Sequence, residues 1–463
     1  MDESQNRGTT SLVDLSKGLS RLAEIAAHPS LQLVKTALGS DASLHLVGGA
    51  VRDALSGKED LDIDLTTALA PDKVQKRLVD SNIKVVPTGV EHGTVAAIFE
   101  SGNIEITTFR RPSSRRESQF GTIIQEDLSG RDFTINAIAF DLNTQQLVDP
   151  FNGIADISEG ILRAVGNARD RFLEDPHRML RLVRFGPAAG RQIDAGTYSA
   201  VQELAPQIQD ISPERIRVEL CKIISSEFAP EAFRQMQHLG LLKHILPEML
   251  PSIGFEQNEF HVHDVFEHTL SVLERAPKEN QIVRWAALYH DLGKPHTLSV
   301  GDDGRRHFYD HERVSYDLCR QSMERLKFSN KEIDRVSLLV KLHMRPLDCG
   351  APGVRRLMRD LSDEFDDWKS LKRADAPPVL GDDDFYRRLA SFEALVKSER
   401  ERLASSGQGS KLAINGHDIM QMGIKEGRKV GTVLKQLEEL VLDDPQLNTK
   451  EELLRRAQEF LGN

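Results

Sequence analysis

The sequence is poor in cysteine and contains no apolar run that approaches the length of a membrane span. Its three cysteines, Cys221, Cys319 and Cys349, have no paired spacing, so we expect neither a zinc module nor a disulfide framework. The opening residues, MDESQNRGTTSL, are polar and partly acidic, unlike a secretory signal or an arginine-rich transit peptide. These features predict a protein of a reducing, cytoplasmic setting with no membrane partner.

An excess of positive charge is also missing, because the formal net charge is −11. A chain of this charge is not expected to coat nucleic acid indiscriminately, and we expect no DNA partner. The 60 Lys and Arg residues still leave room for a local basic surface. At 463 residues the chain is too long for one hydrophobic core and should form two to four domains.

The periodicity of apolar residues changes along the chain. Residues 13–40 show helical spacing, whereas 44–140 contain short strand-like runs with one helix expected over 72–81. Beyond about residue 170 the pattern is helical, with breakers near 300–307, 349–353 and 376–384. This predicts an α+β protein, in which a small mixed-sheet head precedes an all-helical body. The expected domains are 1–170, 171–250, 251–400 and 401–463.

Residues 46–67, LVGGAVRDALSGKEDLDIDLTT, combine a glycine pair with alternating acidic residues. Asp62 and Asp64 are two apart in a strand-like segment, so their carboxylates should share a face. Like charges this close are costly unless a cation lies between them, and Mg²⁺ prefers carboxylates together with substrate phosphates. Gly48 and Gly49 allow a phosphate to approach the backbone. The segment therefore predicts metal-assisted nucleotidyl transfer.

The same segment resembles the first motif of the class II tRNA nucleotidyltransferases, the family of CCA-adding enzymes and their poly(A) polymerase relatives. Further blocks resemble other motifs of this family in the same order: GRDFTINAIAFD at 130–141, DPFNGIADISEGILRAVG at 149–166, FLEDPHRMLRLVRF at 172–185 and SPERIRVEL at 212–220. The resemblance is close over 44–220 and looser over the helical remainder. It implies a catalytic head, a nucleotide-selecting neck, a helical histidine–aspartate (HD) domain and a tRNA-binding tail for the four expected domains.

The resemblance implies roles for individual residues of the head. Asp62 and Asp64 would hold two Mg²⁺ ions, which clamp the attacking and leaving oxygens. Glu105, in NIEITTFR, is either a third carboxylate or a surface strand residue. The expected nucleotide contacts are Gly48, Gly49, Arg52, Arg131, Asp132 and Asn136. Asp53, next to Arg52, has either a functional or a purely structural role. At position 130 this chain has glycine, whereas the family usually has the first of two arginines there.

Asp175 and Arg178 are expected to select the base. We place both in the first turn of one helix, where i,i+3 side chains share a face. A carboxylate accepts from the exocyclic amine of cytosine or adenine, and a guanidinium donates to ring acceptors. The alternative is an acidic helix start that complements the helix dipole. Arg181 and Arg184 continue this basic face toward the nucleotide.

Residues 110–126 correspond to a flexible segment that is longer in full CCA-adding enzymes of this class. The shorter form, RPSSRRESQFGTIIQ, resembles enzymes that add only the two cytidines. Loop length changes at little thermodynamic cost, so complete and partial addition both stay open.

A second group of residues, within 261–375, resembles the HD phosphohydrolase superfamily, with HDLGKP as the specific match. The resemblance implies metal ligands at His268, His290, Asp291 and Asp375, a set suited to a divalent transition metal. His311 and His343 would complete a second metal site or bind phosphate, whereas His261 and His263 are expected to decorate a helix. This domain is either a phosphohydrolase or only a scaffold.

Residues 412–442 resemble the tail of the family, in which Gly423, Gly427 and Gly431 would shape helix junctions of a tRNA-binding region. An ordinary helical hairpin with glycine caps explains the same residues.

The sequence as a whole predicts a template-independent tRNA 3′-terminal nucleotidyltransferase that uses CTP and ATP. The alternatives are a CC-adding or A-adding enzyme, a poly(A) polymerase, a protein whose HD half carries the main activity, and a non-catalytic tRNA-binding module. A poly(A) polymerase would be expected to carry a basic C-terminal extension, which this acidic chain lacks.

Overall fold

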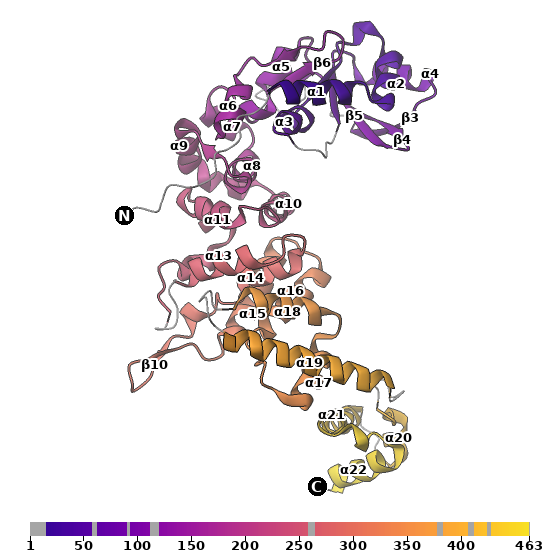
Figure 1. The fold of residues 1–463 in the computed structure, drawn as a ribbon, viewed down its shortest axis with the longest axis vertical. Helices are drawn as coiled ribbons and strands as arrows, with labels where there is room; N and C mark the ends of the chain where they lie inside the picture. The colour runs from indigo at the N-terminus through magenta and orange to yellow at the C-terminus, as the bar shows by residue number, and fades with distance from the viewer. Residues whose placement is uncertain are drawn as a thin grey trace. The chain divides into compact units, whose positions relative to one another are not determined.

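The computed structural model describes residues 15–57, 63–89, 93–111, 120–257, 264–376, 383–405, 412–423 and 427–462. The chain forms two compact units, residues 1–250 and residues 251–463 (Figure 1). Within the described part of the chain, no helix has both the length and the apolar character needed to cross a membrane.

The first unit is built on a mixed sheet with the order β3-β4-β5-β2-β1-β6-β7. Its strands are β1 (His45–Val47), β2 (Asp64–Thr67), β3 (Lys84–Gly89), β4 (Thr94–Phe99), β5 (Gly102–Thr108), β6 (Ala139–Asp141) and β7 (Leu147–Val148). Strand β2 runs parallel to β5, whereas the other paired neighbours are antiparallel. The predicted small mixed sheet is therefore confirmed, and its centre is the buried apolar row of Leu46, Leu65 and Ile106.

Four helices accompany this sheet: α1 (Leu15–Ala26), α2 (Pro29–Leu38), α3 (Gly49–Leu55) and α4 (Pro71–Asp80). Helix α3 contacts β1 and α4 contacts β3, β4 and β5, whereas α1 packs on α3 and α2 on α4. The helices expected over 13–40 and 72–81 are thus present. The strand-like run FTINAIAFD (133–141) is extended only in part, because residues 134–136 form a 3-10 turn before β6. Asp132 causes this departure, since its carboxylate accepts from the Phe133 N–H and from the Asn136 amide and so competes with an extended backbone.

The rest of the first unit is mainly helical. Its helices are α5 (Ile124–Ser129), α6 (Gly153–Glu159), α7 (Ala168–Glu174), α8 (His177–Phe185), α9 (Ala195–Leu204), α10 (Pro213–Ile224), α11 (Ala229–His238) and α12 (Leu242–Ile245). A small parallel pair of strands, β8 (Ile161–Leu162) and β9 (Gln192–Ile193), joins them. The expectation of no strand beyond residue 170 overlooked β9, which is too short to leave a periodic signal.

The stretch 172–185, expected to be one helix, is two. Helix α7 ends at Glu174, and Asp175 has an extended backbone (φ −148°, ψ 97°) before α8 begins at His177. Pro176 explains the break, because a proline disfavours the helical region for the residue before it. Asp175 therefore precedes the helix that carries Arg178, and the prediction that both lie in one first turn is wrong.

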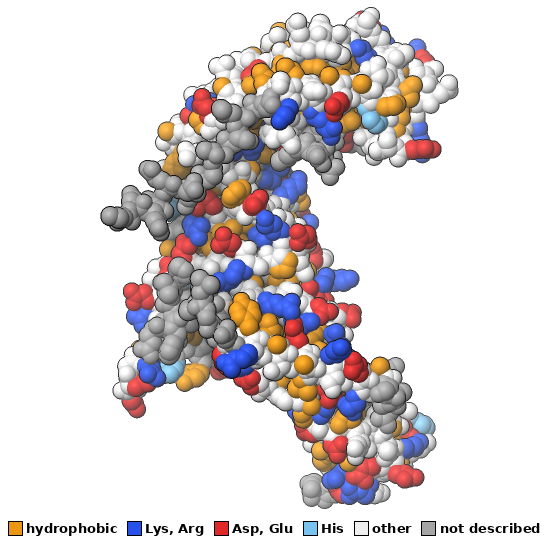
Figure 2. Space-filling model, in the orientation of Figure 1, with side chains coloured by type: hydrophobic (Ala, Val, Ile, Leu, Met, Phe, Trp, Pro, Cys, Tyr) orange, Lys and Arg blue, Asp and Glu red, His pale blue; other side chains and the backbone are white. Residues whose placement is uncertain are grey.

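In the residues that the structure describes, the second unit consists of helices and their connections together with one short hairpin, β10 (Ser299–Val300) with β11 (Arg306–His307). Its helices are α13 (Val265–Arg275), α14 (Gln281–Tyr289), α15 (His311–Arg325), α16 (Asn330–Leu342), α17 (Gly350–Leu361), α18 (Phe365–Ala374), α19 (Asp383–Ser405), α20 (Gly416–Gln421), α21 (Gly427–Asp443) and α22 (Lys450–Gly462). On the face drawn in Figure 2, acidic and basic side chains are interspersed over this unit.

The C-terminal helices α20 to α22 share a separate apolar core that includes Ile419, Leu437 and Leu453. Arg355 joins this group to α17, because its guanidinium donates to the carbonyls of Leu442 and Asp443 at the end of α21. Gly423 has a left-handed backbone (φ +96°) and Gly427 begins α21. Gly431 lies exposed inside α21, so its expected place at a junction is wrong.

Two glycines of the second unit are expected to respond oppositely to alanine. A Cβ on Gly293 would lie 2.2 Å from the His311 carbonyl oxygen, whereas a Cβ on Gly431 would meet no atom within 4 Å. We predict that Gly293→Ala destabilises this unit by about 2–3 kcal/mol through overpacking. Gly431→Ala should stabilise it by about 0.5–1 kcal/mol, because alanine is the better helix former. Calorimetric unfolding of the two full-length variants checks this, and equal transition temperatures would contradict the assigned packing.

Candidate active site and candidate metal centre

The acidic site of the head lies where β2 and β5 run side by side. Asp64, the first residue of β2, is the register partner of Glu105 in β5. Partners in a parallel pair point to the same face, so the two carboxylates are neighbours. Asp64 is half-buried and Glu105 is exposed. Asp62 lies outside the described residues, so its expected alignment with Asp64 stays a prediction.

Gly48 borders this acidic site. Its backbone is left-handed (φ +63°), which glycine adopts without strain. A Cβ at Gly48 would lie 3.0 Å from Arg131 Nη1 and 4.0 Å from Asp64 Oδ2. The absent side chain therefore lets a carboxylate and a guanidinium approach the same stretch of backbone. Gly49 is the first residue of α3, and a Cβ there would lie 3.8 Å from Arg52 Nη2.

Arg52 is engaged by the protein itself. Its Nε and Nη2 donate to the two oxygens of Asp53 at 3.0 and 2.6 Å, and its Nη1 donates to Asn136 Oδ1 at 2.7 Å. Arg131 donates from Nε and Nη2 to Asp127, and its Nη1 makes a long contact of 3.4 Å to the Asn136 carbonyl. The side chain of Arg131 is 23% exposed, against 11% for Arg52. Arg131 is thus the better placed of the two for an external anion.

A buried carboxylate, Asp132, connects the head to α8. Asn136 Nδ2 donates to its Oδ1 at 2.9 Å, and Arg181 Nε donates to its Oδ2 at 2.7 Å. Burial raises the pKa of Asp132, but Arg181 and the hydrogen bonds outweigh burial and leave the pKa below its usual value. Asp132 is therefore ionised and fixes Arg181 against the head.

The two residues expected to read the base are held by different parts of the protein. Asp175 Oδ1 accepts from the His177 N–H at 3.2 Å, and its Oδ2 accepts from Arg215 Nη2 at 3.0 Å. Arg178, in the first turn of α8, donates to Glu174 and to the Gly130 carbonyl. The Arg178 N–H donates to the Asp175 carbonyl at 3.0 Å, but the side chains of these two residues bond to different partners.

Four residues of this site were not singled out from the sequence: Asp127, Phe185, Arg215 and Glu219. Arg184 donates to Glu219 Oε2 at 2.6 Å, and its guanidinium lies 3.9 Å from the centre of the Phe185 ring. Arg215 and Glu219 lie in SPERIRVEL, a block that the sequence marked without assigning any side chain. Their partners are 35 to 40 residues away, so no local pattern reveals the contacts.

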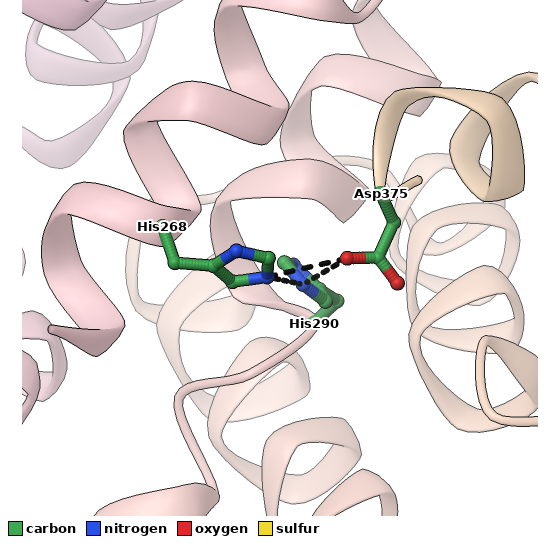
Figure 3. Close-up of side chains that lie close together, drawn as sticks. All are labelled: His268, His290 and Asp375. Atoms are coloured by element: carbon green, nitrogen blue, oxygen red, sulfur yellow. Dashed lines mark hydrogen bonds and ion pairs between the residues drawn. The ribbon is translucent and has the colours of Figure 1, made fainter. Parts of the chain in front are cut away.

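The second unit brings the expected HD residues together. His268 of α13, His290 after α14 and Asp375 after α18 converge (Figure 3). His268 Nε2 lies 3.3 Å from His290 Nε2 and 3.2 Å from Asp375 Oδ1. Ligands about 2.1 Å from one ion in tetrahedral or octahedral geometry lie about 3.0–3.4 Å apart, so these atoms fit around a single cation.

A second cluster, of Asp291, His311 and His343, adjoins the first. Asp291 Oδ2 faces the first cluster, 3.2 Å from both His268 Nε2 and His290 Nε2. Its Oδ1 faces the second cluster, 3.2 Å from His311 Nε2 and 3.6 Å from His343 Nε2. One carboxylate therefore spans the two clusters. His261 and His263 lie outside the described residues.

The orientation of three imidazoles is fixed by backbone carbonyls. The Nδ1 atoms of His290, His311 and His343 lie 2.7–2.8 Å from the carbonyl oxygen three residues earlier. Each Nδ1 therefore carries a hydrogen and each Nε2 faces the cluster, as in protein metal sites. Burial disfavours a protonated His290, but Asp291 and Asp375 outweigh burial and raise its pKa to about 10.

Models of known families match three parts of the chain. They are described as "Poly A polymerase head domain" (residues 44–163), "Probable RNA and SrmB- binding site of polymerase A" (190–253) and "HD domain" (261–374). The order of the three matches along the chain is the same as the order of the sequence motifs.

Curated relatives match most of the chain. An A-adding tRNA nucleotidyltransferase of Deinococcus radiodurans is 32% identical over 409 residues, covering 85% of this chain and 90% of the relative. A CCA-adding enzyme of Streptococcus sanguinis is 30% identical over 427 residues, covering 90% and 92%.

Solved structures match over nearly the whole chain. The Bacillus stearothermophilus CCA-adding enzyme in complex with CTP has a TM-score of 0.70 and 25% identity, covering 96% of this chain and 99% of that one. The fold is shared with the Thermotoga maritima CCA-adding enzyme complexed with tRNA_CCA (TM-score 0.54, 23% identity, 96% and 98% covered). The chain therefore belongs to the family of CCA-adding and A-adding tRNA nucleotidyltransferases.

Proposed function

We propose that this protein extends the 3′ end of tRNA without a nucleic-acid template, adding C from CTP and A from ATP. The observation that carries the proposal is the pairing of Asp64 with Glu105 beside the glycine backbone at Gly48, in a chain of this family. Relatives named as a CCA-adding enzyme and as an A-adding tRNA nucleotidyltransferase both match most of this chain, so the extent of addition is the part that experiment decides.

Nucleotidyltransferases of this kind generally use a divalent metal, typically Mg²⁺. Asp62 and Asp64 would hold it, with Glu105 as a further carboxylate. Such ions neutralise charge on the attacking and leaving oxygens of an in-line displacement. Arg131 is suited to the triphosphate, because its Nη1 faces Gly48. Arg52, whose donors are taken by Asp53 and Asn136, would instead hold the site in shape.

Base selection is assigned to Asp175 and Arg178. A carboxylate accepts from the exocyclic amine that CTP and ATP share, whereas UTP and GTP present a carbonyl at that position. The guanidinium of Arg178 supplies the complementary donors. This pairing needs no nucleic-acid template, because protein groups read the edge of the base.

Removal of the Asp64 carboxylate should abolish transfer. We predict that Asp64→Asn lowers the rate of nucleotide incorporation into tRNA by at least about 10²-fold, since a ligand of the charge-stabilising metal is lost. Asp80→Asn, at an exposed position in the last turn of α4, is the matched control and should keep the full rate. Equal rates for both variants would refute this placement of the active site.

The products distinguish the possible enzymes of this family. Transcripts that end before the tail, after one C and after two C are each offered every nucleoside triphosphate in turn. We expect C on the first two and A on the third. Addition of C alone would identify a CC-adding enzyme, addition of A only after CC an A-adding enzyme, and addition of A to every transcript a poly(A) polymerase.

A second activity is favoured by the carboxylate that spans both histidine clusters. We propose that the HD domain holds divalent transition metal ions and hydrolyses phosphate esters, with 2′,3′-cyclic nucleotide ends as candidate substrates. The nitrogen and oxygen donors suit such ions. Lys294 Nζ, 2.7 Å from Asp291 Oδ2, adds a cation beside the site for a phosphate group.

Substitutions should show which side chains hold metal in one cluster and which hold it in both. We predict that Asp291→Asn removes metal from both, because one of its oxygens faces each, whereas His343→Ala removes it only from the second. Metal content after dialysis and hydrolysis of 2′,3′-cyclic AMP measure this. Asp302→Asn, in the exposed loop between β10 and β11, is the control, and tRNA extension should persist in all three variants. Unchanged metal content in Asp291→Asn would contradict the bridging role.

A further inference from the structure

The guanidinium of Arg178 is held on three sides. Its Nη1 donates to Glu174 Oε2 at 3.0 Å and to the Arg171 carbonyl at 3.3 Å, and its Nη2 donates to the Gly130 carbonyl at 2.9 Å. A guanidinium offers five N–H donors in one plane. Among the described residues, three are taken, which leaves the Nε hydrogen and one Nη2 hydrogen. Nε and Nη2 form the fork that pairs with two acceptors on the edge of a base.

Glu174 holds Arg178 only if its own carboxylate is fixed. An isolated ion pair between residues i and i+4 on a helix surface is weak, and both side chains keep considerable freedom. Glu174 is partly exposed, but its second oxygen, Oε1, accepts from Arg171 Nη2 at 2.6 Å. The carboxylate is therefore held between two guanidiniums.

Arg171, in α7, is itself anchored. Its Nη1 donates to the Ser129 carbonyl at 3.0 Å, and its side chain is only 13% exposed. Burial and the neighbouring Arg178 lower the pKa of Arg171, whereas Glu174 raises it, so the burial of this cation is offset chiefly by that one carboxylate. Ser129 and Gly130 thus each supply a carbonyl, one to Arg171 and one to Arg178.

Gly130, whose carbonyl binds Arg178, has no conformational need to be glycine. Its backbone is helical (φ −84°), so nothing in its conformation requires glycine, and a Cβ there would lie no closer than 3.5 Å to another atom. Backbone strain therefore does not explain the glycine at this position, where the family usually has the first of two arginines. In this protein the arginine linked to Arg178 through Glu174 is Arg171, which lies in helix α7.

We propose that Arg171 is a positioning residue for base selection: through Glu174 and the Ser129 carbonyl it fixes the plane of Arg178, and so the fork presented to the incoming base. The inference rests on the proposed function and concerns only how that function discriminates among nucleotides. Loss of Arg171 frees Glu174, which lets Arg178 turn away from the base. The difference in kcat/KM between correct and incorrect nucleotides then becomes smaller.

The test is the discrimination ratio, kcat/KM for CTP divided by kcat/KM for UTP, on a tRNA transcript that lacks its terminal CCA. We expect Arg171→Ala to lower this ratio about 10-fold or more, the discrimination carried by one bidentate contact. Glu174→Gln should lower it similarly. The double variant Arg171→Ala/Glu174→Gln should be no worse than the stronger single variant, because both act through Arg178.

Arg169→Ala is the matched control. Arg169 lies in the same helix and pairs with Glu203 on an exposed surface, so its loss should leave the ratio unchanged. Equal loss of CTP and UTP incorporation in Arg171→Ala would overturn the inference, because a purely structural role lowers both alike. A ratio unchanged from the unsubstituted protein would also overturn it. If the unsubstituted protein incorporates no nucleotide, the proposed function fails, and the inference fails with it.

Discussion

The buried carboxylate of Asp132 is the point on which the arrangement of the proposed nucleotide site depends. An ion removed from water costs several kcal/mol unless it is paired and hydrogen-bonded. Asp132 meets this condition through Arg181, the Asn136 amide and its neighbouring backbone N–H. These bonds join the turn before β6 to α8. Asn136, oriented in this way, then accepts from Arg52.

Three guanidiniums surround the ring of Phe185, at 3.9–5.0 Å from its centre. Such crowding of like charge would be unfavourable alone, but each guanidinium has its own carboxylate. The pairs are Arg52 with Asp53, Arg181 with Asp132 and Arg184 with Glu219. The aromatic face adds a cation–π contact for each. The cations are therefore fixed in position before any phosphate arrives, which lowers the ordering cost of binding.

The sequence predicted those parts of the site that are encoded locally. Alternation of apolar residues located the strands, and the register of β2 with β5 brought Asp64 beside Glu105 as expected for neighbouring strands. The residues of the two HD clusters were found because each lies in a short, chemically distinctive block. Pairs such as Asp175 with Arg215 were not found, because 40 residues separate them and a single charged residue has no periodicity. The break at Pro176 was overlooked, because the apolar spacing of α7 continues into α8.

The buried carboxylates of the histidine–aspartate clusters and of the proposed nucleotide site are compensated by different kinds of cationic group. Around Asp132 the compensating charges are arginines, which stay protonated at any physiological pH. Around Asp291 they are imidazoles and one lysine, and imidazoles become neutral when a metal ion takes the place of their protons. The first arrangement is permanent and keeps the arginines in fixed positions. The second would exchange protons for metal ions, and Asp291 has one oxygen toward each cluster.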